Sequence, residues 1–275
     1  GLSDSIDPLM MILQEPINVQ IQTTSRCNGK CIICPYLDSW HKANPGTMSD
    51  EVFNRVLDEL APMQIGKLCM YLENEPLLDS RLFERTMLAR IKLNPESLEF
   101  STNASALTLR QALSLAQCVE DIPHEIWISF HGVDKRAHEG CMGLDYNSCL
   151  ANIIRLLNIS DEKKLDIVIR GGGMPMGNVP KHEYTFTQRE FHDFWNHVFQ
   201  ENGIRRKPKL NYFRYHDRAG TIRKNDIRSP EIVRRDLRGF QCRRLKNWLH
   251  FLYTGELTIC CMDYHREEIF GDVTQ

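Results

Sequence analysis

Short apolar or alternating runs are separated by amphipathic stretches along most of the chain. The first run, Asn18–Gln22, precedes a stretch in which Ser49 can cap a helix and apolar residues recur at helical spacing from Val52 to Leu60. The same pair of patterns recurs five more times. The predicted strands cover residues 18–22, 67–72, 98–101, 125–130, 165–170 and 209–215, and the predicted helices cover residues 49–60, 80–93, 108–119, 146–157, 187–202 and 230–237.

A regular alternation of strands and helices predicts parallel strands joined by right-handed crossovers. Six such units indicate an α/β fold, a partial (β/α)6 TIM-like barrel, and a doubly wound sheet is the alternative. Residues 1–17 then form a lead-in and residues 18–238 form the barrel. Residues 239–275 depart from the β/α rhythm and are interpreted as a C-terminal extension.

Polar groups and glycines crowd the carboxyl ends of the predicted strands. Barrel enzymes place their chemistry at this end, so the residues that follow each strand are candidates for the site. These segments are residues 27–34, 73–76, 101–103, 129–132, 170–173 and 214–220.

Composition narrows the class of protein only slightly. The 275 residues are 42% hydrophobic and 25% charged, as in an ordinary globular protein, and the net charge of -2 gives no overall attraction to nucleic acid or to an anionic membrane. No apolar run approaches the roughly 18 residues of a spanning helix, and no signal sequence is recognisable, which predicts a cytoplasmic protein. In that setting the ten cysteines indicate metal ligation or reduced thiols rather than disulfides.

Three of these cysteines lie close together after the first predicted strand. Cys27, Cys31 and Cys34 have a Cys-x3-Cys-x2-Cys spacing on a loop that contains a glycine. Thiolates at such spacings can hold one iron-sulfur cluster, and three ligands leave one of four irons open for a further ligand. The alternatives are a structural zinc site, for which His41 is the nearest histidine, or unrelated thiols.

This loop resembles the signature of the radical S-adenosylmethionine (SAM) superfamily. The resemblance implies a [4Fe-4S] cluster whose open iron binds the amino and carboxylate groups of SAM, with Ile33 packed near the adenine. It also implies reductive cleavage of SAM to a 5′-deoxyadenosyl radical, with an electron donor such as flavodoxin or ferredoxin. The barrel lumen would exclude water and competing hydrogen donors.

The resemblance extends to the ends of later strands. Glu73-Asn74-Glu75-Pro76 is similar to the superfamily's Gly-Gly-Glu-Pro motif, which receives the amino group of SAM, although both glycines are replaced. Asn103 stands in a Thr-Asn-Ala similar to the family's Thr-Asn-Gly, and Ser129 stands where a ribose contact is common. The alternative is that these polar residues only cap and turn the backbone locally.

The C-terminal extension contains a second cysteine pattern. Cys242 precedes Gly255, which would turn a hairpin and bring Cys242 and Cys260 onto neighbouring strands. This spacing resembles the SPASM or twitch extension, which implies an auxiliary [4Fe-4S] cluster, but the sequence ends before the further cysteines that such extensions supply. Cys261 would point away from Cys260 on a strand, and either donates hydrogen to a substrate radical or is simply buried.

The other cysteines and several polar residues have weaker signals. Cys69, Cys118 and Cys149 lie within element patterns and are predicted to be core, whereas Cys141 falls on the loop after the fourth strand. Arg170 and Arg218 stand beside small residues at strand ends and are the candidates for substrate contact, with a salt bridge across the barrel mouth as the alternative. His131 and His216 end strands and could act as acid or base.

The resemblance implies an oxidoreductase or epimerase, and we expect it to act on a small polar molecule such as a sugar or aminocyclitol. By resemblance, 2-deoxy-scyllo-inosamine dehydrogenase-like members are comparable, and so are members that modify ribosomally made peptides. A peptide substrate is the second hypothesis, disfavoured because only residues 1–17 precede the first strand. A non-catalytic iron-sulfur or zinc scaffold is the third, and no membrane or nucleic-acid partner is expected.

Overall fold

The computed structural model describes residues 15–176, 183–216, 238–239 and 241–275. Arg218 and the predicted helix 230–237 lie outside these residues. No helix among the described residues combines the length and the apolar composition that a bilayer crossing needs.

The described residues form one nine-stranded sheet in the order β6-β5-β4-β3-β2-β1-β7-β8-β9. Neighbours from β6 through β1 to β7 are parallel, and β7, β8 and β9 are antiparallel. The strands are β1 Ile17–Ile21, β2 Ile65–Cys69, β3 Ser97–Thr102, β4 His124–Ser129, β5 Ile167–Pro175, β6 Lys209–Tyr215, β7 Trp248–Phe251, β8 Glu256–Thr258 and β9 Ile269–Asp272. All six predicted strands are confirmed, with shifted boundaries.

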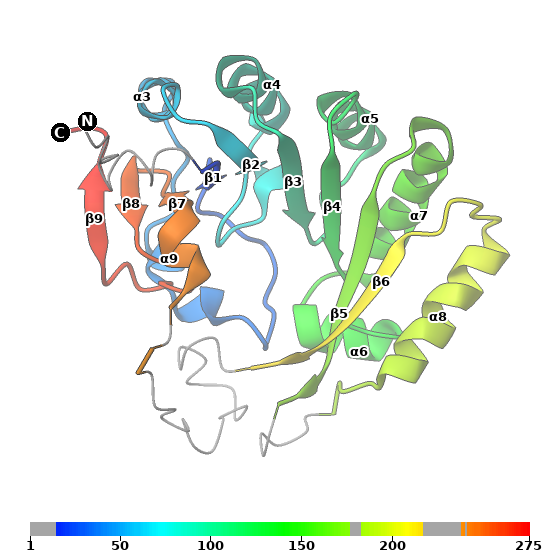
Figure 1. Ribbon diagram of the computed structural model, residues 1–275. Coiled ribbons are helices and arrows are strands. Elements are labelled where there is room, and N and C mark those ends of the chain that lie inside the picture. Colours follow the sequence, from blue (N-terminus) through cyan, green and yellow to red (C-terminus); the bar gives the residue numbers. More distant parts are fainter. Residues whose placement is uncertain (1–14, 177–182, 217–237, 240) are drawn as a thin grey trace.

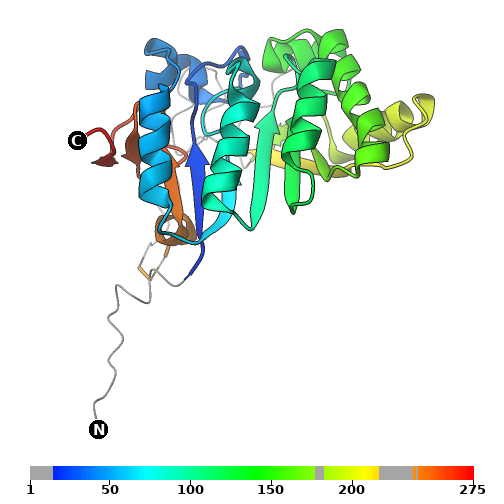
Figure 2. The same ribbon diagram turned by 90° about the horizontal axis from the view of Figure 1, so that it is seen from above.

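The strand order also decides between the two predicted architectures. A doubly wound sheet reverses its strand order at a switch point, whereas β1 to β6 follow one another in sequence order across the sheet. The sheet curves, and the helices lie along its outer side (Figures 1 and 2). The fold is therefore the predicted partial barrel with a C-terminal antiparallel hairpin.

The outer helices begin at residues that cap them well. Ser49 caps one helix, and Thr108 and Thr187 each form a reciprocal capping box with the residue three positions later. The helices that cover the sheet are α3 Asp50–Leu60, α4 Leu82–Leu93, α5 Leu109–Cys118, α7 Tyr146–Lys163 and α8 Gln188–Glu201.

The two faces of the sheet differ because helices cover only one of them. Alternate strand residues such as Ile21, Leu68 and Ile169 are fully buried in the apolar core. The intervening residues carry polar side chains, among them Lys67 and Glu99. Since successive residues of a strand point to opposite faces, these polar positions belong to the inner side of the curved sheet.

Two local predictions were wrong. Cys141 lies not on a loop but in a further helix, α6 Lys135–Met142, which Asp134 caps and in which Cys141 is buried. This helix is only two turns long, too short for its periodicity to stand out. Strand β5 continues five residues beyond Arg170, through three glycines that normally weaken a strand.

The predicted hairpin in the extension is confirmed, with Gly255 at a positive φ of 96° in its turn. Cys242 and Cys260 were expected on neighbouring strands of this hairpin, and that expectation was wrong. Cys242 instead precedes a short helix, α9 Arg243–Asn247, and Cys260 comes two residues after β8 ends. The pairing of β7 with β1 joins the extension to the barrel sheet, beside the strand that leads into the three-cysteine loop.

Candidate active site

The three-cysteine loop follows β1 and is held from two sides. Its backbone NH groups at Lys30 and Ile32 donate to the carbonyls of Met142 and Cys141 at 2.7 and 2.9 Å, at the end of α6. The Tyr36 hydroxyl accepts from the Cys27 NH at 2.8 Å and donates to the Ser25 carbonyl at 2.9 Å. The missed helix α6 thus supports one side of the loop.

The thiols of this loop are crowded. The Cys31 and Cys27 sulfurs lie 3.3 and 3.7 Å from the point that a Cβ on Gly29 would occupy. Burial, with a smaller contribution from Glu75, raises the pKa of Cys27 to about 12, and burial raises the pKa of Cys31 well above its usual value. A bound cation reverses this effect by stabilising the thiolates, so the donor set fits a metal cluster.

The three thiols are not already grouped as a set of metal ligands. Among the residues that the structure describes, no three His, Cys, Asp or Glu side chains gather as metal ligands would.

Glu75 ties the ends of three strands together. Its carboxylate accepts from the Thr102 hydroxyl at 2.7 Å, from the Asn103 NH at 2.7 Å and from the Leu77 NH at 3.1 Å. Its own NH donates to the carbonyl of Arg26 in the cysteine loop at 2.9 Å. Burial raises the pKa of Glu75 to about 7, against the effect of these hydrogen bonds. In this structure the Glu75 carboxylate is turned toward the end of β3 and the backbone of its own loop.

We expect Glu75→Gln to change how stability depends on pH. The folded pKa of about 7 exceeds the ordinary value of 4.5, so between these values the folded protein binds more protons than the unfolded chain. Stability from Glu75 is then complete below pH 4.5 and falls as pH rises to 7, by at most about 1.4 kcal/mol per pH unit. Urea unfolding at pH 5, 6 and 7.5 should show the wild-type advantage over Glu75→Gln shrinking. An advantage that stays constant over this range contradicts the prediction.

Glu73 and Asn74 point to different partners. Glu73 is buried against His41, which lies in the short helix α2 Trp40–Ala43, and burial raises the pKa of Glu73 to about 7. The other ring nitrogen of His41 lies 3.4 Å from the Gln22 amide. His41 therefore faces Glu73, which disfavours the zinc alternative. Asn74 accepts from the Leu72 NH at 2.9 Å, a local turn contact.

Asn103 links the third strand end to the cysteine loop. Its amide donates to the Asn28 side chain at 2.9 Å, and its side-chain oxygen accepts from the Ser105 hydroxyl at 2.6 Å. Ser129, the last residue of β4, pairs in register with Arg170 of β5. The predicted residues of β1 to β4 therefore gather at one end of the barrel.

The Ile33 side chain packs against Gly172 of β5. Its terminal carbon would lie 2.9 Å from a Cβ on Gly172, so only glycine permits this approach without movement. The Gly172 NH donates to Nδ1 of His131 at 2.9 Å, so a neutral His131 carries its proton on the other ring nitrogen. Ile33 is fully buried between these strand ends.

Arg170 lies over two aromatic rings. Its guanidinium carbon is 4.8 Å from the centre of the Phe213 ring and 5.5 Å from the centre of the Trp127 ring. Such contacts hold a guanidinium flat while its edge can still donate hydrogen bonds.

A polar network on the inner face was missed by sequence reasoning. The Tyr71 hydroxyl hydrogen-bonds to Glu99, and the Lys67 ammonium lies 2.5 Å from Glu99 and 3.5 Å from Glu125. The only sequence signal was a charged residue at an alternate position within each of three predicted strands. Their convergence depends on strand register, which the sequence does not show.

The helix that follows Cys242 contacts one of the other two thiols of the extension. Arg244, in the helix that follows Cys242, donates to the Cys261 sulfur at 3.2 Å. A hydrogen bond from Cys261 lowers the pKa of Cys260 to about 6 and raises the pKa of Cys261. Cys261 was expected to point away from Cys260. The expectation was wrong because both residues lie in a turn beyond β8, and Cys261 is half-buried.

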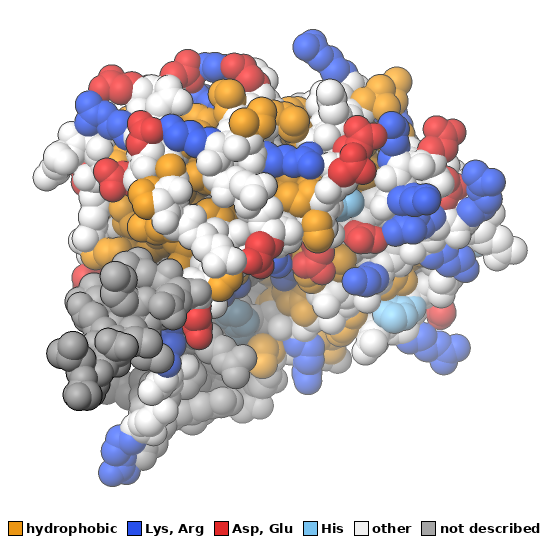
Figure 3. All heavy atoms as spheres, turned by 45° about the horizontal axis from the view of Figure 1, so that its top comes forward, with side chains coloured by type: hydrophobic (Ala, Val, Ile, Leu, Met, Phe, Trp, Pro, Cys, Tyr) orange, Lys and Arg blue, Asp and Glu red, His pale blue; other side chains and the backbone are white. Residues whose placement is uncertain are grey.

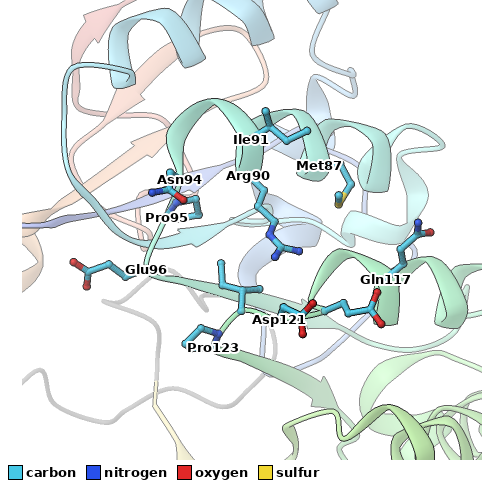
Figure 4. A pocket seen from close by; sticks show the side chains of 11 residues that line it. Met87, Arg90, Ile91, Asn94, Pro95, Glu96, Gln117, Asp121 and Pro123 are labelled. Atoms are coloured by element: carbon cyan, nitrogen blue, oxygen red, sulfur yellow. The ribbon is translucent and has the colours of Figure 1, made fainter.

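Other surface features lie away from these residues. A hollow of about 620 Å³ between α4 and α5 lies at the amino ends of β3 and β4, opposite to the cysteine loop (Figure 4). Acidic and basic side chains are interspersed over the face shown in Figure 3 rather than gathered into a field of one sign. Neither feature competes with the carboxyl ends of the strands as the site.

Comparison with known proteins defines the class. Residues 21–175 match the family model of the radical SAM superfamily, and the chain belongs to this superfamily. Its members are enzymes that bind a [4Fe-4S] cluster and SAM. A search of curated protein sequences gives no significant match.

Solved structures with a similar fold include three enzymes of this kind. His-tagged anSMEcpe with bound AdoMet has a TM-score of 0.58 at 16% identity, covering 94% of this chain and 78% of the other. BtrN in complex with AdoMet and 2-DOIA has a TM-score of 0.53 at 12% identity, covering 95% and 79%. Streptococcus suis SuiB bound to the precursor peptide SuiA has a TM-score of 0.53 at 15% identity, covering 94% and 62%. At these identities the likeness shows the fold.

Proposed function

We propose that Cys27, Cys31 and Cys34 hold a [4Fe-4S] cluster that binds SAM at its open iron. Support comes from the thiols crowded above Gly29 and from the match of this segment to the superfamily. When bound, this cofactor pair supplies a carbon-centred radical that removes hydrogen from an unactivated C–H bond of the substrate. Cys31 and Ile33 pack against the apolar core, which limits the access of water from that side of the loop.

The remaining cofactor contacts are assigned to the ends of β2 to β5. Glu73, Asn74 and Asn103 offer side-chain or backbone oxygens beside the loop, and Ser129 offers a hydroxyl. Glu75 positions these segments through its three hydrogen bonds. Ile33 provides an apolar contact for the adenine. In this proposal the strand ends make the polar contacts with SAM, and the cysteine loop makes the apolar contact with the adenine.

The substrate is proposed to be a small polar molecule such as a sugar or aminocyclitol, which is dehydrogenated or epimerised. The observation that carries this is Arg170, held flat over Phe213 and Trp127 beside an inner face lined by Tyr71 and Glu99. These groups can donate to and accept from several hydroxyl or amino groups at once. Arg218 is a second candidate for substrate contact. An auxiliary cluster at Cys242 and Cys260 would accept an electron in dehydrogenation, and Cys261 would donate hydrogen in an epimerisation.

A peptide substrate is the second candidate. It is favoured by the similar fold of SuiB, whose structure holds a precursor peptide, and of anSMEcpe, which has been solved with a Kp18Cys peptide. The two candidates differ in how much of the inner face they need, because a peptide must extend out of the barrel mouth.

Anaerobically reconstituted protein with reductant and SAM should form 5′-deoxyadenosine. Deuterated aminocyclitols, sugars and peptides are then compared as substrates, and the true one transfers deuterium into the product nucleoside. If no condition yields 5′-deoxyadenosine, the proposed function is wrong. Transfer from peptides alone supports the second candidate.

Arg170→Ala should lower kcat/KM for the accepted polar substrate roughly 10- to 100-fold, since a hydrogen bond to a charged group contributes about 1.5–3 kcal/mol. Arg170→Lys keeps the charge but loses the planar fork, so only part of this activity should return. Arg189→Ala on the exposed side of α8 is the matched control. Equal kinetics for Arg170→Ala and Arg189→Ala would exclude substrate contact by Arg170.

A further inference from the structure

The C-terminal extension touches the three-cysteine loop through one tyrosine. The hydroxyl of Tyr264 lies 3.9 Å from the sulfur of Cys34, within hydrogen-bonding distance for sulfur. The two residues are 230 positions apart in sequence, and Tyr264 is only 6% exposed. The contact therefore joins the last part of the chain to a thiol of the proposed cluster.

Several interactions hold this tyrosine in place. Its carbonyl accepts from the Trp40 NH at 2.9 Å, just after the cysteine loop. The guanidinium of Arg266 lies 5.0 Å from the centre of the Trp40 ring and pairs with Glu256 of β8. Asp263 accepts from the Thr258 hydroxyl at 3.0 Å and so fixes the preceding turn. The position of Tyr264 is thus determined by the extension and by the segment after the cysteines together.

Metal binding would set the direction of the hydrogen bond. An iron-bound cysteine is a thiolate, which has no proton and can only accept, whereas a phenol can donate. Hydrogen bonds to the sulfurs of an iron-sulfur cluster are among the factors that set its reduction potential. Such a bond stabilises the more negative reduced state more than the oxidised state, and therefore raises the potential.

We propose that Tyr264 is a positioning residue that donates a hydrogen bond to the Cys34 thiolate and raises the reduction potential of the SAM-binding cluster. This rests on the proposed role of Cys34 as a cluster ligand. The extension would then act on the radical-generating step directly, independently of any metal that it binds itself.

Neighbouring tyrosines provide the contrast. The Tyr36 hydroxyl already donates to the Ser25 carbonyl. The Tyr253 hydroxyl, also in the extension, donates to the Asn44 carbonyl at 3.0 Å, so its hydrogen-bond acceptor in the same segment is a backbone oxygen. Tyr253→Phe therefore removes a comparable hydroxyl from the same interface and is the matched control.

The test is an anaerobic redox titration of the full, reconstituted chain, followed by electron paramagnetic resonance. The signal that changes on addition of SAM identifies the cluster with the open iron. Tyr264→Phe should lower the midpoint potential of that signal relative to both wild type and Tyr253→Phe, with unchanged iron content. Proton hyperfine spectra in H2O and D2O should show an exchangeable proton coupled to the wild-type cluster that Tyr264→Phe lacks.

A second variant changes the potential in the opposite direction. Tyr264→3-fluorotyrosine keeps the ring and makes the phenol a stronger donor, so the midpoint potential should rise. If Tyr264→Phe fails to take up iron, the 3-fluorotyrosine variant alone tests the hydrogen bond through the shift of the midpoint potential. A wild-type chain that binds no SAM-responsive cluster refutes the proposed function itself. If the cluster forms but neither Tyr264 variant shifts its potential, only the role of Tyr264 is refuted.

Discussion

Replacing Cys27, Cys31 or Cys34 by alanine should abolish 5′-deoxyadenosine formation and remove about four irons per chain. A three-ligand cluster that loses one thiolate has only two protein ligands left to hold it. Cys141, whose carbonyl braces the loop, is itself buried in α6. Iron content, the visible absorption of the cluster and nucleoside formation measure the effect together.

Cys149→Ala is the control for this result. Cys149 is a fully buried thiol of α7 and belongs to the apolar core. Its replacement removes a thiol without touching the loop, so iron content and SAM cleavage should stay near wild type. Retention of iron and of SAM cleavage in the Cys27, Cys31 and Cys34 variants would show that the cluster is elsewhere, and stoichiometric zinc in the purified wild type would favour the scaffold alternative.

The double variant Cys242→Ala/Cys260→Ala should reduce the iron content from about eight to about four per chain. The helix after Cys242 reaches the turn of Cys260 and Cys261 through Arg244, so both thiols belong to one part of the extension. SAM cleavage should persist because the SAM-binding cluster is unchanged. A dehydrogenation should lose its electron acceptor, so the amount of oxidised product should fall far below the amount of 5′-deoxyadenosine formed.

The comparison that decides this prediction is between the ratio of product to 5′-deoxyadenosine in wild type and in the double variant. Cys118→Ala, a buried thiol that donates to the Phe83 carbonyl, controls for the loss of a thiol as such. Wild-type protein that binds only about four irons, all of them lost with Cys27, Cys31 and Cys34, would leave the extension without a cluster.

The C-terminal extension is joined to the barrel at two places. Because β7 pairs with β1, the sheet continues from the strand before the cysteine loop into the hairpin. The turn after β8 then reaches the loop through Tyr264. An extension joined by backbone pairing and by a side chain can influence the first cluster even where its own thiols serve another purpose.

Much of this site follows from the sequence alone. The β/α alternation gave the six parallel strands, since periodicity of 2 and 3.6 is a local property of the chain. The spacing of Cys27, Cys31 and Cys34 indicated the superfamily, because ligands on one loop need no tertiary information to be brought together. The same holds for Gly255, whose turn the hairpin confirms.

Only the tertiary structure decided which distant residues meet. It placed Glu75 against the backbone of β3's end, Glu73 against His41, and Tyr264 against Cys34. It also formed the inner network of Lys67 and Glu99 from strands that are consecutive in the sheet. These contacts depend on register and on loop closure over tens to hundreds of residues, for which a local pattern of polar and apolar positions carries no information.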